Sequence, residues 1–178
     1  TNLTMVTALG TGTGGTGTYT VSASQTVAST TITTVGQGFL NIPSWVKRIT
    51  LILSGLSTSS TAARGVMIGT SSGLVSSGYT SNGSRLTSAG IATGANTNTF
   101  VCNSNVAADL LSGTFVLNPT GNSNEWICTH SLTDDAVVAN YVGGGKKTLT
   151  GTLDRVVITS ITFTDTLDAG SVSMMYEG

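Results

Sequence analysis

Charged side chains are scarce in this sequence. Lys, Arg, Asp and Glu make up 8% of the 178 residues, whereas about 25% is usual for a soluble domain. The formal net charge is -1, and the seven basic residues are scattered apart from the pairs Lys47-Arg48 and Lys146-Lys147. A surface that binds nucleic acid needs a basic patch to neutralise phosphates, so we expect no nucleic-acid partner.

Long hydrophobic runs are also lacking. No stretch approaches the ~20 apolar residues of a membrane-spanning helix, and the first residues lack the basic and apolar segments of a secretory signal. We therefore expect neither a membrane protein nor a protein secreted by that route. A chain that begins at Thr1 is what removal of an initiator methionine leaves, which favours a complete small gene product.

The abundant residues are Gly, Ser and Thr, and they punctuate short runs in which apolar or β-branched residues alternate with polar ones. This pattern predicts an all-β protein, a jelly-roll-like antiparallel β-sandwich. The predicted strands are 18–23, 26–35, 46–54, 65–69, 75–80, 97–103, 113–118, 125–132, 147–150, 153–163 and 170–176. One marginal helix is predicted from Ser104 or Asn105 to Gly113, where a cap and a terminating glycine flank an apolar segment.

Three predicted strands indicate which face is buried. Ile49, Leu51 and Leu53 alternate with more polar residues and are expected to point inward. Trp126, Cys128 and His130 share one face of the strand 125–132. The strand 153–163 carries bulky side chains on both faces, which predicts a central position in its sheet.

The first 17 residues are rich in Gly and Thr and poor in large side chains. We expect residues 1–17 to form an N-terminal arm that gains order from a neighbouring subunit, followed by one β-sandwich domain over 18–178. Gly12, Gly14 and Gly17 have the spacing of a dinucleotide-binding loop. However, a predicted strand follows them where a helix is required, and no acidic residue precedes Asp109, so we attribute the match to chance and expect no cofactor.

The segment Gly69–Gly73 fits the G-x-S-x-G pattern of a hydrolase with Ser71 as nucleophile, and Asp109 and His130 follow in hydrolase order. A nucleophile elbow passes from a strand directly into a helix, whereas another strand and turn are predicted after Gly73. We therefore favour a Gly/Ser hairpin, assign no catalytic residue and predict that the protein is not an enzyme.

The two cysteines and the single histidine leave several readings open. Cys102 and Cys128 fit small buried core residues, although a disulfide between them is an alternative because sequence spacing does not determine their separation. Both could join His130 at a zinc ion, but no fourth ligand is evident and the spacing matches no structural zinc pattern, so we predict no metal site.

Two acidic segments and two glycosylation sequons can be explained without a functional site. Asp165 and Asp168 lie three residues apart in a segment that resembles a β-turn more than a calcium loop, and the acidic segment beginning at Thr133 likewise predicts a turn. Asn2 and Asn82 begin glycosylation sequons, which matter only in a secretory route.

Several stretches are similar to a family of small virion proteins of tailed bacteriophages. They are IPSWVKRITLILSGLSTSS, SSGYTSN, NEWICTHSL and KTLTGTLDRVVITSITFTDTLDAGSVSMMYEG, and the upstream GTGGTGTYTVSASQTVASTTIT resembles the usual lead-in. The resemblance is strongest over residues 42–58 and from 149 to the end. It departs at Leu167, where an aromatic residue is common, at the two cysteines and at Gly178.

This resemblance implies a β-rich, oligomeric structural protein of the virion, assembled in the cytoplasm of a bacterial host. We expect a capsid decoration or head-fibre protein, a trimer whose partners are its own copies and the major capsid protein or other virion proteins. The alternative is a tail or fibre module that binds a host receptor or glycan, with recognition by the loops around Tyr79–Leu86 and Asp134–Tyr141.

Overall fold

The computed structural model describes residues 6–9, 11, 19–21 and 36–178. The chain divides into two compact units, Thr1–Thr33 and Thr34–Gly178. In the first unit, β1 (Val6–Leu9) pairs antiparallel with β2 (Tyr19–Val21). The predicted strand 26–35, the glycines of the dinucleotide-like motif and the predicted boundary between residues 17 and 18 lie outside the described residues.

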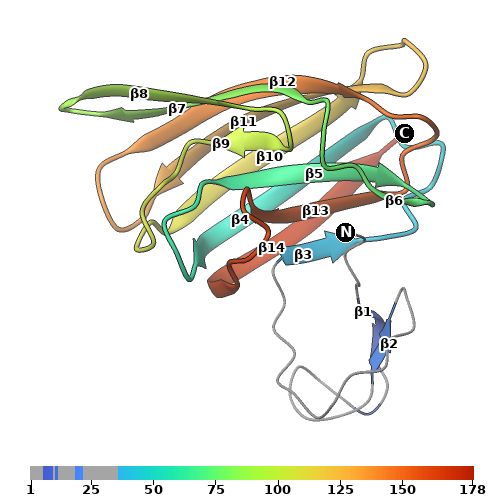
Figure 1. Ribbon diagram of the computed structural model, residues 1–178, viewed down its shortest axis with the longest axis horizontal. Helices are drawn as coiled ribbons and strands as arrows, with labels where there is room; N and C mark the ends of the chain where they lie inside the picture. Colours follow the sequence, from blue (N-terminus) through green and yellow to red (C-terminus); the bar gives the residue numbers. More distant parts are fainter. Residues whose placement is uncertain (1–5, 10, 12–18, 22–35) are drawn as a thin grey trace. The chain divides into compact units, whose positions relative to one another are not determined.

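The second unit is an antiparallel β-sandwich, as the alternating pattern predicts (Figure 1). The larger sheet has seven strands in the order β14-β4-β10-β11-β12-β7-β8. Their bounds are β4 Arg48–Thr58, β7 Thr80–Thr87, β8 Gly90–Asn96, β10 Leu111–Pro119, β11 Glu125–Asp134, β12 Asn140–Thr148 and β14 Leu167–Glu177.

The smaller sheet has the order β3-β13-β5-β6, and β9 also pairs with β5. Its strands are β3 Gly36–Phe39, β5 Arg64–Thr70, β6 Gly73–Leu74, β9 Phe100–Cys102 and β13 Arg155–Ser160. As predicted, β13 is central, between β3 and β5, and Val156, Val157 and Ile158 are all buried.

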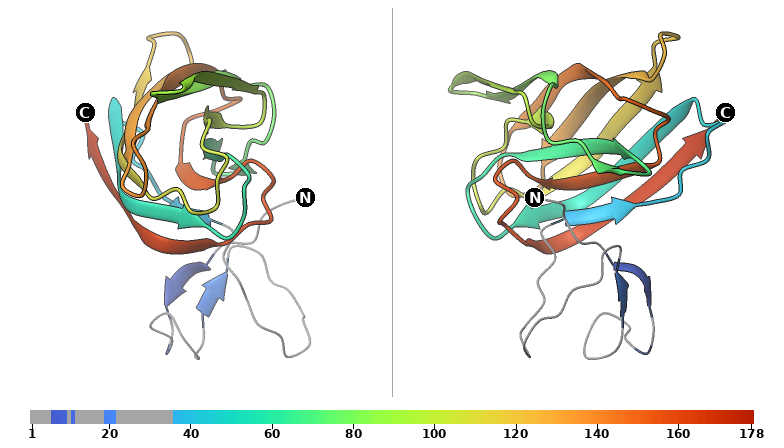
Figure 2. Two further views of the ribbon diagram at one scale, coloured as in Figure 1. Left: turned by 90° about the vertical axis from the view of Figure 1, so that its left-hand side faces the viewer. Right: turned by 45° about the vertical axis from the view of Figure 1, so that its right-hand side comes forward.

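The path of the chain follows the order of a jelly roll. It alternates between the sheets, from β3 to β4, then to β5 and β6, to β7 and β8, to β9, to β10–β12, to β13 and finally to β14. The three-stranded meander β10–β12 occupies the position of one strand in the eight-stranded form, and β14 is an added edge strand. The larger sheet curls around the core (Figure 2).

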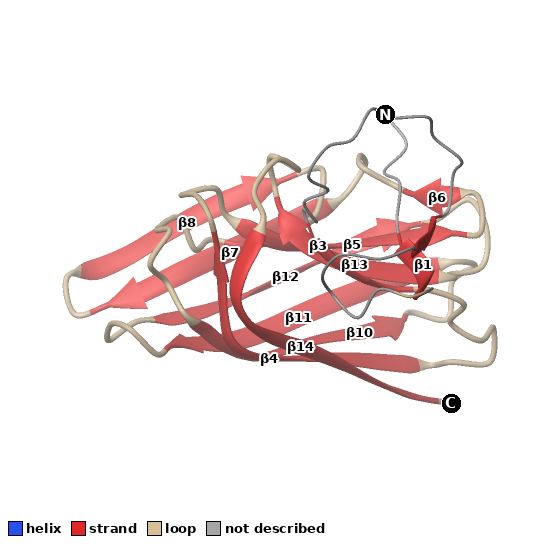
Figure 3. Ribbon diagram, turned by 90° about the horizontal axis from the view of Figure 1, so that it is seen from below, coloured by secondary structure: helices blue, strands red, loops and turns tan. Residues whose placement is uncertain are grey.

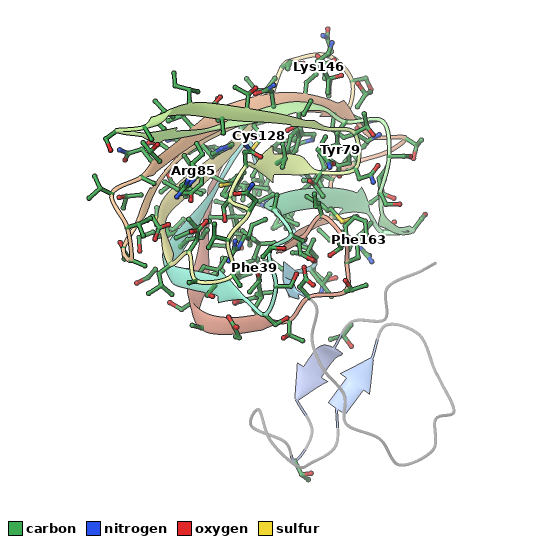
Figure 4. All side chains as sticks on the ribbon, turned by 60° about the vertical axis from the view of Figure 1, so that its left-hand side comes forward. Phe39, Tyr79, Arg85, Cys128, Lys146 and Phe163 are labelled. Atoms are coloured by element: carbon green, nitrogen blue, oxygen red, sulfur yellow. The ribbon has the colours of Figure 1, made fainter. Side chains whose placement is uncertain are left out.

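The core lies between the two sheets, and the alternation in β4 and β11 decides which residues enter it. Ile49, Leu51 and Leu53 are buried as predicted. In β11, every second residue from Trp126 to Leu132 is buried, so that Cys128 and His130 share the inner face. Cys128 and Tyr79 lie inside the sandwich, whereas Lys146 points outward (Figure 4).

Two predictions of local structure are wrong. The segment from Ser104 to Gly113 is not a helix, because its backbone and polar side chains contact the core residue Arg64 and β10 begins at Leu111. Most of the predicted strand 75–80 is irregular, because the buried hydroxyl of Tyr79 donates a hydrogen bond to the carbonyl oxygen of Val75.

Candidate interaction surface

The predicted hairpin at Gly69–Gly73 is confirmed. Thr70 at the end of β5 pairs with Gly73 at the start of β6, which places Ser71 in an exposed turn between two strands. Asp109 is bonded to Tyr141, and the ring nitrogens of His130 have no hydrogen-bond partner in the described part of the chain. The hydrogen-bonded chain of a Ser-His-Asp triad is therefore not formed by these three residues.

His130 and both cysteines lie in the core. The His130 ring lies 4.8 Å from the Phe115 ring, and burial lowers its pKa to about 4, so the imidazole is neutral at pH 7. Cys102 and Cys128 are free, buried thiols and do not form a disulfide; burial raises the pKa of both, that of Cys102 to about 12. Among the described residues no group of three or more His, Cys, Asp or Glu could hold a metal ion.

A buried arginine holds the segment between β9 and β10. The guanidinium of Arg64 is fully buried and donates to Ser104 Oγ at 2.5 Å and to the carbonyl oxygen of Val106 at 2.9 Å. Burial lowers its pKa, and the nearby charge of Asp109 opposes that effect. These bonds join residues 40 or more apart in sequence, which explains why the local pattern gave no sign of them.

Beside this arginine lies a second polar cluster that the sequence pattern did not indicate. The Tyr141 hydroxyl donates to Asp109 Oδ2 at 2.7 Å and accepts from Arg85 Nε at 3.0 Å. Burial raises the pKa of Asp109. Burial also opposes ionisation of Asp134, but hydrogen bonds from the Ala136 and Leu110 amides hold its pKa below the usual value. The cluster connects the segment before β10 and the turn after β11 to β12, so its role is structural.

Figure 3 shows β10, β11 and β12 side by side in the seven-stranded sheet, and the residues on the outer face of its central rows are exposed or partly exposed. Two complete cross-strand rows run through its centre. The first row is Met175, Thr50, Val116, Thr129, Gly144, Asn82 and Ala95, and the second is Ser173, Ile52, Thr114, Ser131, Val142, Ser84 and Thr93. No residue of either row is buried and none is ionisable.

Charged residues of this face flank the central rows: Arg48, Lys146 and Glu177 lie in the adjacent row, and Glu125 lies in the row beyond it. Glu177 pairs with Arg48 in register, and Lys146 lies beside Ile127. Lys146 also forms an ion pair with Glu125 at 3.6 Å. On an ordinary protein surface about a quarter of the residues are charged. Among the fourteen residues of the two central rows, about four charged side chains would therefore be expected. Their absence marks these rows as a candidate interaction surface.

A second apolar group lies at the far end of the same sheet. Asn140 of β12 pairs with Leu86, which in turn pairs with Ile91, so the β11–β12 loop and the β7–β8 hairpin are neighbours. Val138 is 92% exposed and Ile91 is 70% exposed. The predicted recognition loop at Asp134–Tyr141 is thus largely a loop, but Tyr79–Leu86 is mostly strand β7 and begins with a buried side chain.

Two aromatic side chains meet on the surface near the end of the chain. Trp45, in the turn before β4, and Tyr176, in β14, have ring centroids 5.6 Å apart in an edge arrangement. They are 56% and 43% exposed. The sequence pattern gave no sign of this pair, because its members are 131 residues apart.

The comparisons with known proteins add no relative. No family model, curated protein or solved structure matches the chain. Within the described residues, no helix has the length and apolar character needed to cross a membrane.

Proposed function

We propose that this chain is a structural protein of a bacteriophage particle, a capsid decoration or head-fibre protein that acts by burying surface between subunits. One observation carries the proposal: two complete rows across a seven-stranded sheet contain no buried and no ionisable residue. Covering such a surface requires little desolvation of charge. The resemblance of the sequence to small virion proteins supports the particle as the place where the surface is covered.

The partners in this proposal are copies of the chain and other virion proteins, including the major capsid protein. Three copies are the expected unit. The N-terminal arm, residues 1–17, contacts the shell or a neighbouring copy and can add a strand to a sheet edge. The chain performs no reaction and requires neither a cofactor nor a metal ion.

Quantitative mass spectrometry of purified particles tests the proposal. A decoration protein is expected at hundreds of copies per particle, measured against the major capsid protein. Absence of the chain from particles overturns the virion assignment. A count of a few copies overturns the decoration role and favours a tail location.

The second candidate, a tail or fibre module that binds a host glycan, is favoured by the exposed pair Trp45 and Tyr176. Exposed aromatic rings can stack on the apolar face of a sugar. Under this alternative the isolated protein binds glycans on an array and Trp45→Ala removes the binding, whereas Val106→Ala, which alters an exposed side chain outside the predicted recognition loops, does not. Absence of glycan binding by the wild-type chain removes this alternative.

A further inference from the structure

Strand β8 lies at one end of the strand order of the larger sheet, and none of the described strands pairs with its outer edge. With β7 it forms a hairpin that projects from the end of the sandwich (Figures 1 and 3). Its sequence, GIATGAN, has no charged residue and no proline, and its register with β7 has no bulge. Proteins usually protect an exposed edge with a charge, a proline or a bulge, because an unprotected edge recruits other strands. Their absence from β8 indicates an edge that another strand covers.

The other edges of the described sandwich are protected. Strands β3, β6 and β9 of the smaller sheet have only four, two and three residues. Strand β14 is long, but its register with β4 shifts twice between Leu167 and Ser171, and it carries two acidic residues. Gln37 of β3 also donates a hydrogen bond to the carbonyl oxygen of Val172 at 3.0 Å. The contrast identifies β8 as the edge suited to accept a strand.

The backbone of β8 presents hydrogen-bonding groups in a regular row along this edge. A two-residue turn joins Thr87 to Gly90, so these two residues form a hydrogen-bonded pair. Because hydrogen-bonded and non-hydrogen-bonded pairs alternate along an antiparallel ladder, every second residue of β8 directs its N–H and C=O groups away from β7. These residues are Ile91, Thr93 and Ala95. A strand that pairs with this edge therefore gains about six ladder hydrogen bonds.

Contacts on the inner face of the sheet hold this edge in position. Asn103, which follows β9, donates from Nδ2 to the carbonyl oxygen of Ala92 at 3.1 Å. Its Oδ1 would lie 2.6 Å from a Cβ atom at Gly94, so the amide lies directly against the glycine. On the outer face, the side chain of Ile91 is 70% exposed. The strand is thus ordered before a partner arrives, which lowers the entropic cost of pairing.

A second copy of β8 matches this edge residue by residue. Consider a two-fold axis that is perpendicular to the sheet and passes beside Thr93. Thr93 then faces Thr93 of the other copy, and Ile91 faces Ala95, in an antiparallel ladder that uses the whole strand. Paired threonines stabilise neighbouring strands, and the large Ile91 meets a small partner on each side of the axis. The larger sheets of the two copies become continuous.

The charges permit this pairing. No residue from Leu86 to Val101 is ionisable, so no like charges meet across the axis. The nearest charged side chain in the sheet is that of Arg85, which pairs with Ala92 and is turned toward Tyr141 of its own copy. The two copies of Arg85 are three strand spacings apart, about 14 Å along the sheet, which exceeds the Debye length of about 10 Å at 0.1 M ionic strength. Repulsion between identical copies is therefore weak.

We propose that β8 binds β8 of a second copy of this chain, edge to edge and antiparallel about Thr93, so that the larger sheets of two copies join into one. This inference rests on the proposed assembly function and names the contact and the partner. The pairing depends on ladder hydrogen bonds more than on buried side-chain area, as strand addition generally does. The contact alone gives dimers. Where a separate contact forms the expected trimer, β8 links one trimer to the next.

Sedimentation equilibrium of the full chain tests the contact. The wild type is expected to reach a mass of two chains, or of linked trimers, as the concentration rises. Thr93→Pro removes the N–H group at the axis from both copies and leaves the ladder with β7 intact. It is expected to raise the dissociation constant of the contact by at least about 30-fold. The control Thr93→Val keeps the N–H group and the branched shape, and should associate as the wild type does.

Two further variants make the test independent of the proline. Thr93→Lys places like charges opposite each other at the axis, on a side chain that already faces solvent, and should also weaken the association. Because Cys102 and Cys128 are buried, the sulfur of Thr93→Cys is the accessible thiol of that variant, and a short bismaleimide should join two copies. Thr129→Cys is exposed on β11 and lies more than about 20 Å from its equivalent in the pair, so it should not be joined.

Three results would overturn the inference: a wild type that stays monomeric up to about 1 mM, a mass of three chains only, or an association that Thr93→Pro and Thr93→Lys leave unchanged. An association that is lost only on deletion of residues 1–17 assigns the contact to the arm and overturns it as well. These results are separate from the fate of the proposed function. A monomer found at hundreds of copies per particle removes the β8 contact and leaves the decoration role. A dimer that is absent from particles does the opposite.

Discussion

The hydroxyl of Tyr141 donates a hydrogen bond to Oδ2 of Asp109 across 2.7 Å inside the sandwich. It connects β12 to the irregular segment before β10, in place of the helix that the local sequence favours. Tyr141 is fully buried. If its hydroxyl were removed, no bulk water could take its place as the donor to the Asp109 carboxylate. The position of the segment thus depends on long-range polar contacts.

Tyr141→Phe is expected to destabilise the fold by about 2 kcal/mol, because it leaves Asp109 and Arg85 without their shared hydroxyl. Urea unfolding of the wild type and the variant measures the difference. Tyr176→Phe removes a hydroxyl from a tyrosine that is 43% exposed and should change the stability by less than about 0.5 kcal/mol. Equal losses for the two variants would contradict a structural role for the buried cluster.

The single histidine predicts a specific pH dependence. In the unfolded chain its imidazole is protonated near its ordinary pKa of 6.5, whereas in the folded protein burial lowers the pKa to about 4. The unfolded state therefore binds more protons in this range, and stability falls as the pH decreases from about 6.5 to about 4.

His130→Leu removes this contribution. Between pH 7 and pH 4 the wild type should lose about 3 kcal/mol more stability than the variant. Denaturant unfolding at a series of pH values measures both curves. Because the remaining titratable groups are the same in both proteins, parallel curves would show that His130 does not titrate as a buried base.

Gly143 permits a close approach between strands. A Cβ atom at this position would lie 2.3 Å from the carbonyl oxygen of Asn82 and 2.7 Å from Cε1 of His130. Gly143→Ala should therefore cost about 2–3 kcal/mol, as overpacking of a core does. Gly151→Ala is the matched control, since the nearest atom to its Cβ is 3.7 Å away. Thermal unfolding that shows equal stability for both variants would contradict the packing at β12.

Deletion of residues 1–17 tests the arm. The described core residues lie between Phe39 and Met174, so the melting temperature of the truncated chain should remain within a few degrees of that of the wild type. Attachment to particles, measured by co-sedimentation, should weaken. Loss of folding after the deletion would show that these residues belong to the core.

The alternating strands were the part of the fold most accessible to sequence analysis. Ile49, Leu51 and Leu53 face inward because successive side chains of a strand point to opposite faces of the sheet, and only one face of β4 packs on the core. Strand β8, with the sequence GIATGAN, was missed because it has no buried face and therefore no alternation. Most of β12 was missed for a related reason, since Gly143, Gly144 and Gly145 carry no side chain to show a pattern.

The candidate surface could be predicted only in outline. The expected trimer implied that some surface is covered, but the rows that contain Thr129 and Ser131 are formed from seven strands that are distant in sequence. The same limit applies to the Arg64 contacts. Whether a Ser or Thr faces solvent beside six other uncharged residues depends on the order and register of the strands, which local composition does not specify.

The most direct test of the central claim, that the uncharged sheet face is the working surface of the protein, is thiol labelling in assembled particles. Ser131→Cys and Ser72→Cys should react with a maleimide at similar rates in the dilute isolated protein, since both positions are exposed. In particles, the account predicts that the position on the face is protected at least about tenfold and that the hairpin position is not. Equal labelling of the two positions in particles would contradict it.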